Sequence, residues 1–141
     1  MDPEQFVDTL MALWREPVPD GDAGIAAFGA CYAAELTVNG VPFTLAALVE
    51  RARMLQTAYS DIRPEVLEVI AAPGRVVVAF LMHVRHTGPL TTPLGVLPAT
   101  GRAGAARTID ILAVADERVT GITVVADELG LLTQLGGVRL S

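Results

Sequence analysis

Residues 105–137 read AARTIDILAVADERVTGITVVADELGLLTQLGG, and they carry the clearest signals of the fold. Residues 105–115 and 118–127 are rich in Ile, Val and Thr, a composition typical of β-strands. Asp116-Glu117 predicts a tight turn between the two strands. We expect a short apolar helix at about 129–135, which Gly136-Gly137 ends.

Upstream of this stretch, two more strands are expected, at 62–71 and 75–86, separated by Ala72-Pro73-Gly74. The first half of the chain instead shows helical spacing and caps. The elements expected there are a helix at 3–15 capped by Asp2, a short helix at 22–30, an extended segment at 32–38 closed by an Asn39-Gly40 turn, and a helix from Thr44 to Tyr59. Helices first and strands second predict one α+β domain over residues 1–141.

The composition excludes several classes of protein. The chain has 141 residues, of which 52% are hydrophobic and 18% charged, so it can bury a proper core. Its net charge is −6 and no Lys/Arg cluster occurs, which argues against a nucleic-acid-binding protein. The single cysteine, Cys31, is expected to be a buried free thiol.

The chain also lacks the sequence features of export and membrane insertion. Its acidic start, Met1-Asp2-Pro3-Glu4, does not resemble a signal peptide, and no apolar run is long enough to cross a membrane. We therefore expect a cytoplasmic protein with no membrane partner.

An uncharged segment runs from Thr87 to Gly101 and contains three prolines and three glycines. Loops of this length without secondary structure are uncommon and are often functional. Two interpretations stay open: a loop packed on its own domain or on a dimer partner, and a lid over a pocket.

Four sequence fragments from His86 onward carry a resemblance to a known family. They are His86-Thr87-Gly88, Pro98-Ala99-Thr100-Gly101-Arg102, Ile109-Asp110-Ile111, and the final run from Asp127 to Gly136. In this order and spacing they resemble the SnoaL-like polyketide cyclases. The stretch from Leu48 to Ile62 resembles the helix and turn that precede them in that family.

The resemblance implies a cone-shaped, nuclear transport factor 2-like fold: a curved mixed sheet wrapped around helices, with an apolar cavity open at one end. It also implies homodimers packed through the sheets. In the cyclases the aspartate that opens the final motif is the acid/base of an intramolecular aldol ring closure, and here that position is Asp127. The preceding strand departs from the family pattern, since Gly121 and Thr123 replace its acidic residue and tryptophan.

The residues themselves allow two roles for Asp127. Simple alternation places Thr123, Val125 and Asp127 on one strand face. If that face lines an apolar cavity, poor solvation raises the pKa of the Asp127 carboxyl and suits it to proton transfer. The other reading is that Asp127 caps the final helix.

Asp110 and His86 are the other candidate catalytic residues. Asp110 lies within an apolar strand and needs a partner. It could share acid and base roles with a second carboxylate, or form a structural hydrogen bond to Arg107, Arg102 or a histidine. His83 and His86 point to opposite strand faces and cannot chelate one metal, so no metal site is expected, and His86 could orient a ligand carbonyl.

The resemblance implies a cofactor-free cyclase or related isomerase that acts on a hydrophobic, polyketide-like carbonyl compound. The carbonyl itself stabilises the carbanion, so no cofactor is needed. The alternative is a noncatalytic binding or interaction domain on the same fold. The residues expected to contact the ligand are Trp14, Phe28, Tyr32, Leu55, Tyr59, Phe80, Thr123 and Val125.

Overall fold

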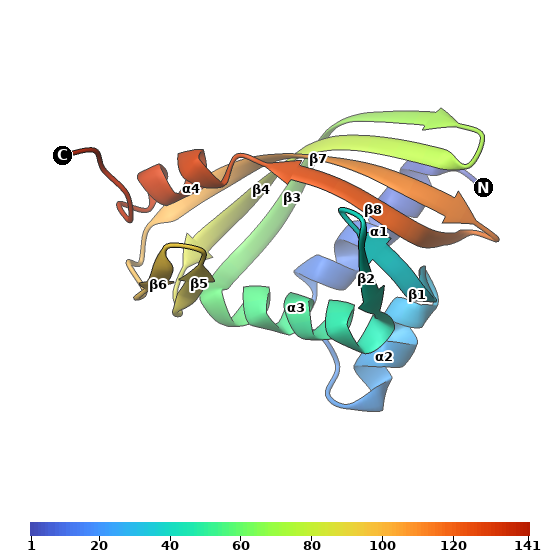
Figure 1. Ribbon diagram of the computed structural model, residues 1–141, viewed down its shortest axis with the longest axis horizontal. Helices are drawn as coiled ribbons and strands as arrows, with labels where there is room; N and C mark the ends of the chain where they lie inside the picture. Colours follow the sequence, from blue (N-terminus) through green and yellow to red (C-terminus); the bar gives the residue numbers. More distant parts are fainter.

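The computed structural model describes residues 1–141 as one α+β domain built on a curved sheet (Figure 1). The elements, in chain order, are α1 (Pro3–Arg15), α2 (Asp22–Gly29), β1 (Tyr32–Val38), β2 (Val41–Thr44), α3 (Leu45–Ala58), β3 (Tyr59–Ala72), β4 (Arg75–His86), β5 (Leu90–Thr92), β6 (Gly95–Leu97), β7 (Ala103–Ala115), β8 (Arg118–Ala126) and α4 (Glu128–Gln134). The predicted fold class is confirmed.

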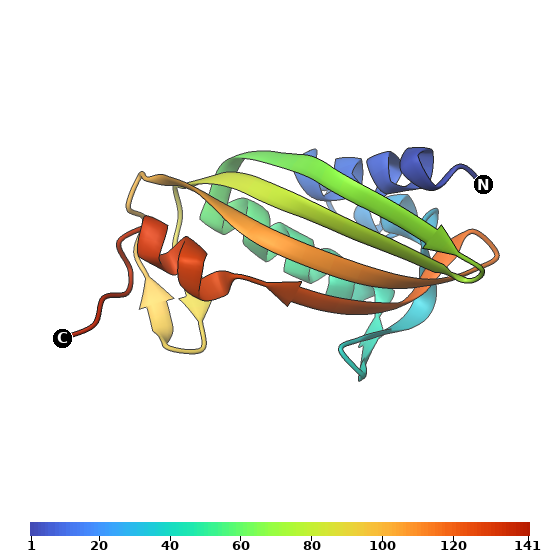
Figure 2. The same cartoon turned by 90° about the horizontal axis from the view of Figure 1, so that it is seen from above.

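Six strands form the main sheet, in the order β2-β1-β8-β7-β4-β3. All neighbouring strands are antiparallel except β1 and β8, which run parallel. α3 lies beneath the sheet in Figure 1, and the face that it covers is called the inner face here. Figure 2 looks onto the opposite, outer face, which the helices leave uncovered along most of its length.

Local sequence explains where the helices begin. Asp2 caps α1 by accepting hydrogen bonds from the backbone N–H groups of Glu4 and Gln5, and Pro3 occupies the first helical position. Thr44 caps α3 by accepting from the N–H of Ala47. The predicted last residue of α3, Tyr59, instead begins β3. No helix has the length and hydropathy of a membrane span.

The core is divided into two clusters along the inner face. The larger cluster joins α1, α2 and α3 to the middle of the sheet and contains Phe28, Val78 and Phe80. The smaller cluster lies at the other end, where α4 and the β5–β6 hairpin meet the sheet, and contains Tyr59 and Leu131. Cys31 is a buried free thiol, as predicted.

A β-bulge in β8 reverses the expected orientation of its second half. Val114 pairs with Val119 and Ala113 with Gly121, so Thr120 is an extra residue between the two pairs. Beyond the bulge the residues that pair with inner-face positions of β7 are Ile122, Val124 and Ala126. Simple alternation from Val119 therefore predicts the wrong face for residues 121–127.

The uncharged segment forms a small hairpin rather than an irregular loop. β5 and β6 pair through Leu90–Leu97 and Thr92–Gly95. The backbone N–H groups of Thr87 and Gly88 both donate to the carbonyl of Ala58, which fixes the hairpin to the end of α3. Leu90 and Leu97 pack on the smaller core cluster. This packing supports the first of the two interpretations, a segment packed on its own domain.

Candidate functional site

Asp110 is the acidic residue of the inner face. It lies on β7 between Val78 of β4 and Val124 of β8. Val78 is buried, and Val124 and Asp110 are half-buried. The ion pairs of the molecule are Arg15–Glu16, Arg53–Glu50 and His83–Glu65, so Asp110 belongs to none of them.

Burial raises the pKa of the Asp110 carboxyl from 3.8 to about 7. Burial is the only cause, so neither a hydrogen bond nor a nearby cation offsets it. The prediction that Arg107, Arg102 or a histidine satisfies Asp110 is therefore wrong. Arg107 is exposed, because its side chain lies on the other face of the same strand.

Tyr32, one of three aromatic residues that pack together, lies within electrostatic range of this carboxylate. Trp14 of α1 donates its Nε1–H to the Tyr32 hydroxyl at 2.8 Å, and Phe28 of α2 packs against both rings at centroid distances of 5.6 and 5.8 Å. Burial raises the pKa of the Tyr32 hydroxyl far above its ordinary value, the Trp14 hydrogen bond lowers it, and the charge of Asp110 raises it further. A protonated hydroxyl and a carboxyl that titrates near neutrality therefore lie close together.

Asp127 does not face the interior. It is exposed, and its Oδ1 accepts the N–H of Gly130 at 2.8 Å, which caps α4. Thr123 and Val125 are exposed on the outer face for the same reason, the bulge at Thr120. The prediction that these three residues line the cavity is wrong, and the capping role of Asp127 is confirmed.

His86 lies far from Asp110. It ends β4, whereas Asp110 pairs with Val78, eight residues earlier on that strand. At a rise of about 3.3 Å per residue the separation along the strand is roughly 26 Å. His86 is completely buried beside Tyr59, with ring centroids 6.1 Å apart, and it belongs to the other end of the domain.

The predicted ligand contacts therefore divide into separate groups. Trp14, Phe28 and Tyr32 pack together, and Tyr32 lies within electrostatic range of Asp110, while Tyr59 and Leu55 belong to the smaller core cluster near His86. Phe80 lies in the larger cluster. The structure thus places Asp110 near the Tyr32 hydroxyl, and it does not bring together the three predicted catalytic residues.

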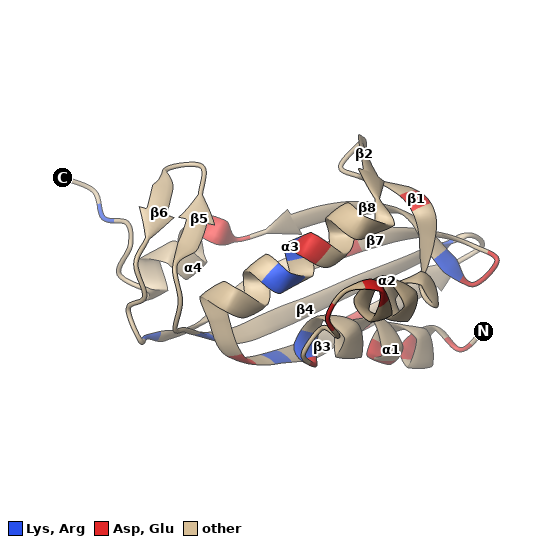
Figure 3. Ribbon diagram, turned by 90° about the horizontal axis from the view of Figure 1, so that it is seen from below, with Lys and Arg blue, Asp and Glu red and all other residues tan.

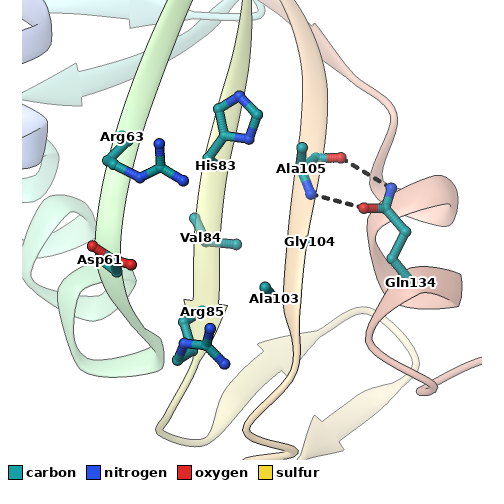
Figure 4. Close-up of a pocket in the computed structure, with 9 residues that line it drawn as sticks. All are labelled: Asp61, Arg63, His83, Val84, Arg85, Ala103, Gly104, Ala105 and Gln134. Carbon is teal, nitrogen blue, oxygen red and sulfur yellow. Dashed lines mark hydrogen bonds between the residues drawn. The ribbon is translucent and has the colours of Figure 1, made fainter.

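Sequence reasoning missed a hollow of about 280 Å³ on the outer face (Figure 4). Arg63, His83 and Arg85 line it from β3 and β4, and Asp61 lies beside them. At its rim Gln134 of α4 binds the backbone of Ala105 on the free edge of β7, through hydrogen bonds of 2.8 and 3.0 Å. The sequence did hold one sign of this hollow: His83 and Arg85 are two residues apart in a strand, so their polar side chains share one face.

A second hollow, of about 320 Å³, lies between α1 and β3 and is lined by Glu4, Asp8 and Glu68 among others. Neither hollow includes Asp110. No group of three or more His, Cys, Asp or Glu side chains is placed to hold a metal ion. Figure 3 shows acidic and basic residues interspersed over the underside of the molecule rather than gathered into a patch.

Residues 10–135 match the family model described as SnoaL-like polyketide cyclase. Solved structures with the same fold include TsrD from Streptomyces laurentii, at 20% identity and a TM-score of 0.79 over 96% of this chain and 95% of that one. A SnoaL-like polyketide cyclase from Agrobacterium tumefaciens is 14% identical, with a TM-score of 0.77 over 96% of this chain and 99% of that one. IdmH from Streptomyces antibioticus is 16% identical, with a TM-score of 0.76 over 96% of this chain and 99% of that one. No curated protein matches the sequence.

Proposed function

This chain belongs to the family of SnoaL-like polyketide cyclases, and from that premise we propose that it is a cofactor-free acid–base catalyst with Asp110 as its proton-transfer residue. The substrate class is a hydrophobic carbonyl compound of polyketide type. The observation that carries the proposal is a carboxyl on the inner face whose pKa of about 7 places it between base and acid at neutral pH.

The proposed chemistry is an intramolecular aldol ring closure. The Asp110 carboxylate removes a proton from the carbon next to a carbonyl group, and the resulting enolate attacks a second carbonyl carbon of the same molecule. One carbon–carbon bond forms, and the second carbonyl oxygen becomes an alkoxide. Protonated Asp110 then returns its proton to that alkoxide, so the residue ends the cycle as it began.

The Tyr32 hydroxyl supplies the electrostatic part of the mechanism. It accepts the Trp14 N–H, which leaves its own proton free for a substrate oxygen. The raised pKa keeps this hydroxyl protonated, so it acts as a hydrogen-bond donor to the developing enolate oxygen. Trp14 is a positioning residue, because it acts on substrate only through the Tyr32 oxygen.

Paired substitutions at two aspartates test this assignment. Replacing either with Asn removes one carboxylate, and Asn still caps a helix, so Asp127→Asn keeps α4 intact. We expect Asp110→Asn to slow ring closure of polyketide esters, and deuterium exchange at the acidic carbon of the same esters, by about 10²–10⁴-fold. Asp127→Asn should leave both rates within about twofold. The opposite pattern would return the catalytic role to Asp127.

A second candidate function is noncatalytic binding of an apolar ligand. It is favoured by one observation, the use of Asp127 as an exposed helix cap. The test is to measure binding of polyketide esters to the wild-type chain and to Asp110→Asn. Equal binding, with no ring closure or deuterium exchange in either protein, would support the binding function and exclude catalysis.

We also propose that the outer face packs against a second copy of the chain. Ile109, Ile111 and Val125 are 48, 42 and 72% exposed there. Both signs of charge surround them, Arg63 and Arg107 with Glu65 and Glu68, so the face can complement itself around a twofold axis.

Light scattering with size-exclusion chromatography tests the dimer. Ile111→Glu should convert a dimer of wild-type chain into a monomer, because it places a charge in the apolar centre of the face. Leu94→Glu is the control, since Leu94 is exposed on the β5–β6 hairpin instead. A wild-type chain that elutes as a monomer at high concentration would disprove this arrangement.

A further inference from the structure

The imidazole of His86 is held on one side and free on the other. Its Nδ1 lies 3.0 Å from the Thr100 hydroxyl and 3.2 Å from the Thr100 backbone nitrogen. The side chain is completely buried. Among the buried nitrogen and oxygen atoms of side chains, Nε2 of His86 is the one that has no hydrogen-bond partner.

Thr100 determines which nitrogen of the neutral ring carries the proton. A backbone N–H can only donate, so Nδ1 must accept from it with a lone pair. The proton of the neutral ring is therefore on Nε2. The Thr100 hydroxyl accepts the Arg102 N–H, which leaves its own proton to donate to Nδ1 as well. Thr100 is thus a positioning residue for a buried Nε2–H donor.

A buried donor without an acceptor costs free energy, and such groups are rare in folded proteins. The surroundings of His86 restrict what acceptor can satisfy it. Tyr59, Val84 and Leu131 make this end of the core apolar, while the nearby Arg85 and Arg102 are exposed at its surface and Arg85 is bound to the carbonyl of Gly101. An uncharged oxygen on an apolar molecule is the acceptor that fits such an environment.

The elements that cover this end of the core are short. The β5–β6 hairpin has three residues in each strand, and α4 has seven residues. Leu90 and Leu97 of the hairpin pack on the same small cluster as Leu131 and Leu135 of α4. A small ligand can reach the fully buried His86 only when these elements open, and short elements with few buried side chains open at the lowest free-energy cost.

We propose that His86 and the small core cluster form a second ligand site, in which the Nε2–H binds an uncharged carbonyl or hydroxyl oxygen of an apolar molecule. This site is distinct from the one at Asp110, because His86 lies eight positions along β4 from Val78, the partner of Asp110. The neutral imidazole only donates a hydrogen bond there, so the proposed role of the site is binding rather than proton transfer.

Nitrogen-15 NMR of histidine-labelled wild-type protein tests the proposal directly. The chain has two histidines, and His83→Gln assigns the spectrum because His83 lies on the outer face, bound to Glu65. The probes are cyclohexanone, which carries an acceptor oxygen, and methylenecyclohexane, which has nearly the same shape without one. We expect protonated Nε2 in the free protein, a downfield shift of its proton with cyclohexanone alone, and about tenfold tighter binding of that probe.

Several results would overturn the proposal. They are a neutral ring protonated on Nδ1, equal effects of the two probes, no response to cyclohexanone, or a bound water that already accepts the Nε2–H and stays in place. His86→Phe should remove the preference for cyclohexanone while keeping binding of methylenecyclohexane. The wild-type comparison decides the matter even if this variant does not fold.

Discussion

Asp110 shows how a single residue takes its chemistry from its neighbours. Its strand, Thr108-Ile109-Asp110-Ile111-Leu112, places it between two valines on adjacent strands. The sequence identified it as an acidic residue in need of a partner, and the structure provides none. What remains is a carboxyl whose pKa burial raises to about 7.

This raised pKa makes stability depend on pH in a specific direction. The folded-state value of about 7 exceeds the ordinary 3.8, so the folded chain binds more protons than the unfolded chain between these values. The contribution of Asp110 to stability is complete below about pH 4 and is lost as the pH rises through 7. At about 1.36 kcal/mol per pKa unit, the loss is at most about 4 kcal/mol.

Asp110→Asn should abolish this dependence. Its free energy of unfolding, relative to that of wild type, should rise between pH 4 and 8, as measured by urea denaturation at several pH values. Asp127→Asn makes the same charge change at an exposed position and serves as the control. A constant difference between Asp110→Asn and wild type over that range would contradict the account of Asp110.

Tyr32 gives a second prediction at this scale. Tyr32→Phe removes the donor hydroxyl and leaves the packing of the ring against Phe28 unchanged. We expect kcat for ring closure to fall by about 10²–10³-fold, with a smaller change in KM, because the hydrogen bond is strongest to the developing enolate. Unchanged kcat would exclude Tyr32 from the mechanism.

At the scale of elements, the ends of helices and strands control the geometry. α4 begins at the Asp127 cap and its Gln134 completes the edge of β7. Asp127→Ala should therefore lower the free energy of unfolding by about 1 kcal/mol, whereas Asp127→Asn should change it little. Equal losses in the two variants, measured by thermal or urea unfolding, would show that the carboxylate has a role besides capping.

The attachment of the β5–β6 hairpin to α3 depends on one glycine. A Cβ atom on Gly88 would overlap the carbonyl oxygen of Thr57, a backbone atom that cannot move aside cheaply. Gly88→Ala should therefore destabilise the fold by several kcal/mol and expose the small core cluster. Gly29→Ala, in α2 with only a tight contact to a Leu45 methyl group, should have a far smaller effect on the unfolding midpoint.

For the whole molecule, the sequence predicted the order and type of the main elements and the α+β class. It did so because caps, turns and period-two alternation are local signals, as at Asp2, Thr44 and Asn39-Gly40. The position of the bulge at Thr120 leaves no such signal, because it is set by how β8 pairs with β7. One extra residue there turned three predicted site residues outward.

The separation of Asp110 from His86 also depends on strand pairing, which the sequence does not show. Both residues lie on the inner face, and the sequence shows only that they belong to neighbouring strands. Which part of β4 lies beside Asp110 depends on strand register, and the register pairs it with Val78. Two polar centres at opposite ends of one sheet follow from that register.

The proposed mechanism requires Asp110 to exchange a proton near neutral pH, and carbon-13 NMR titration of its side-chain carboxyl carbon measures that exchange. Asp110→Asn identifies the resonance by its disappearance. The account predicts a midpoint near pH 7 for the folded protein. A midpoint near pH 4 would contradict it, because that carboxyl would be solvated like any surface aspartate.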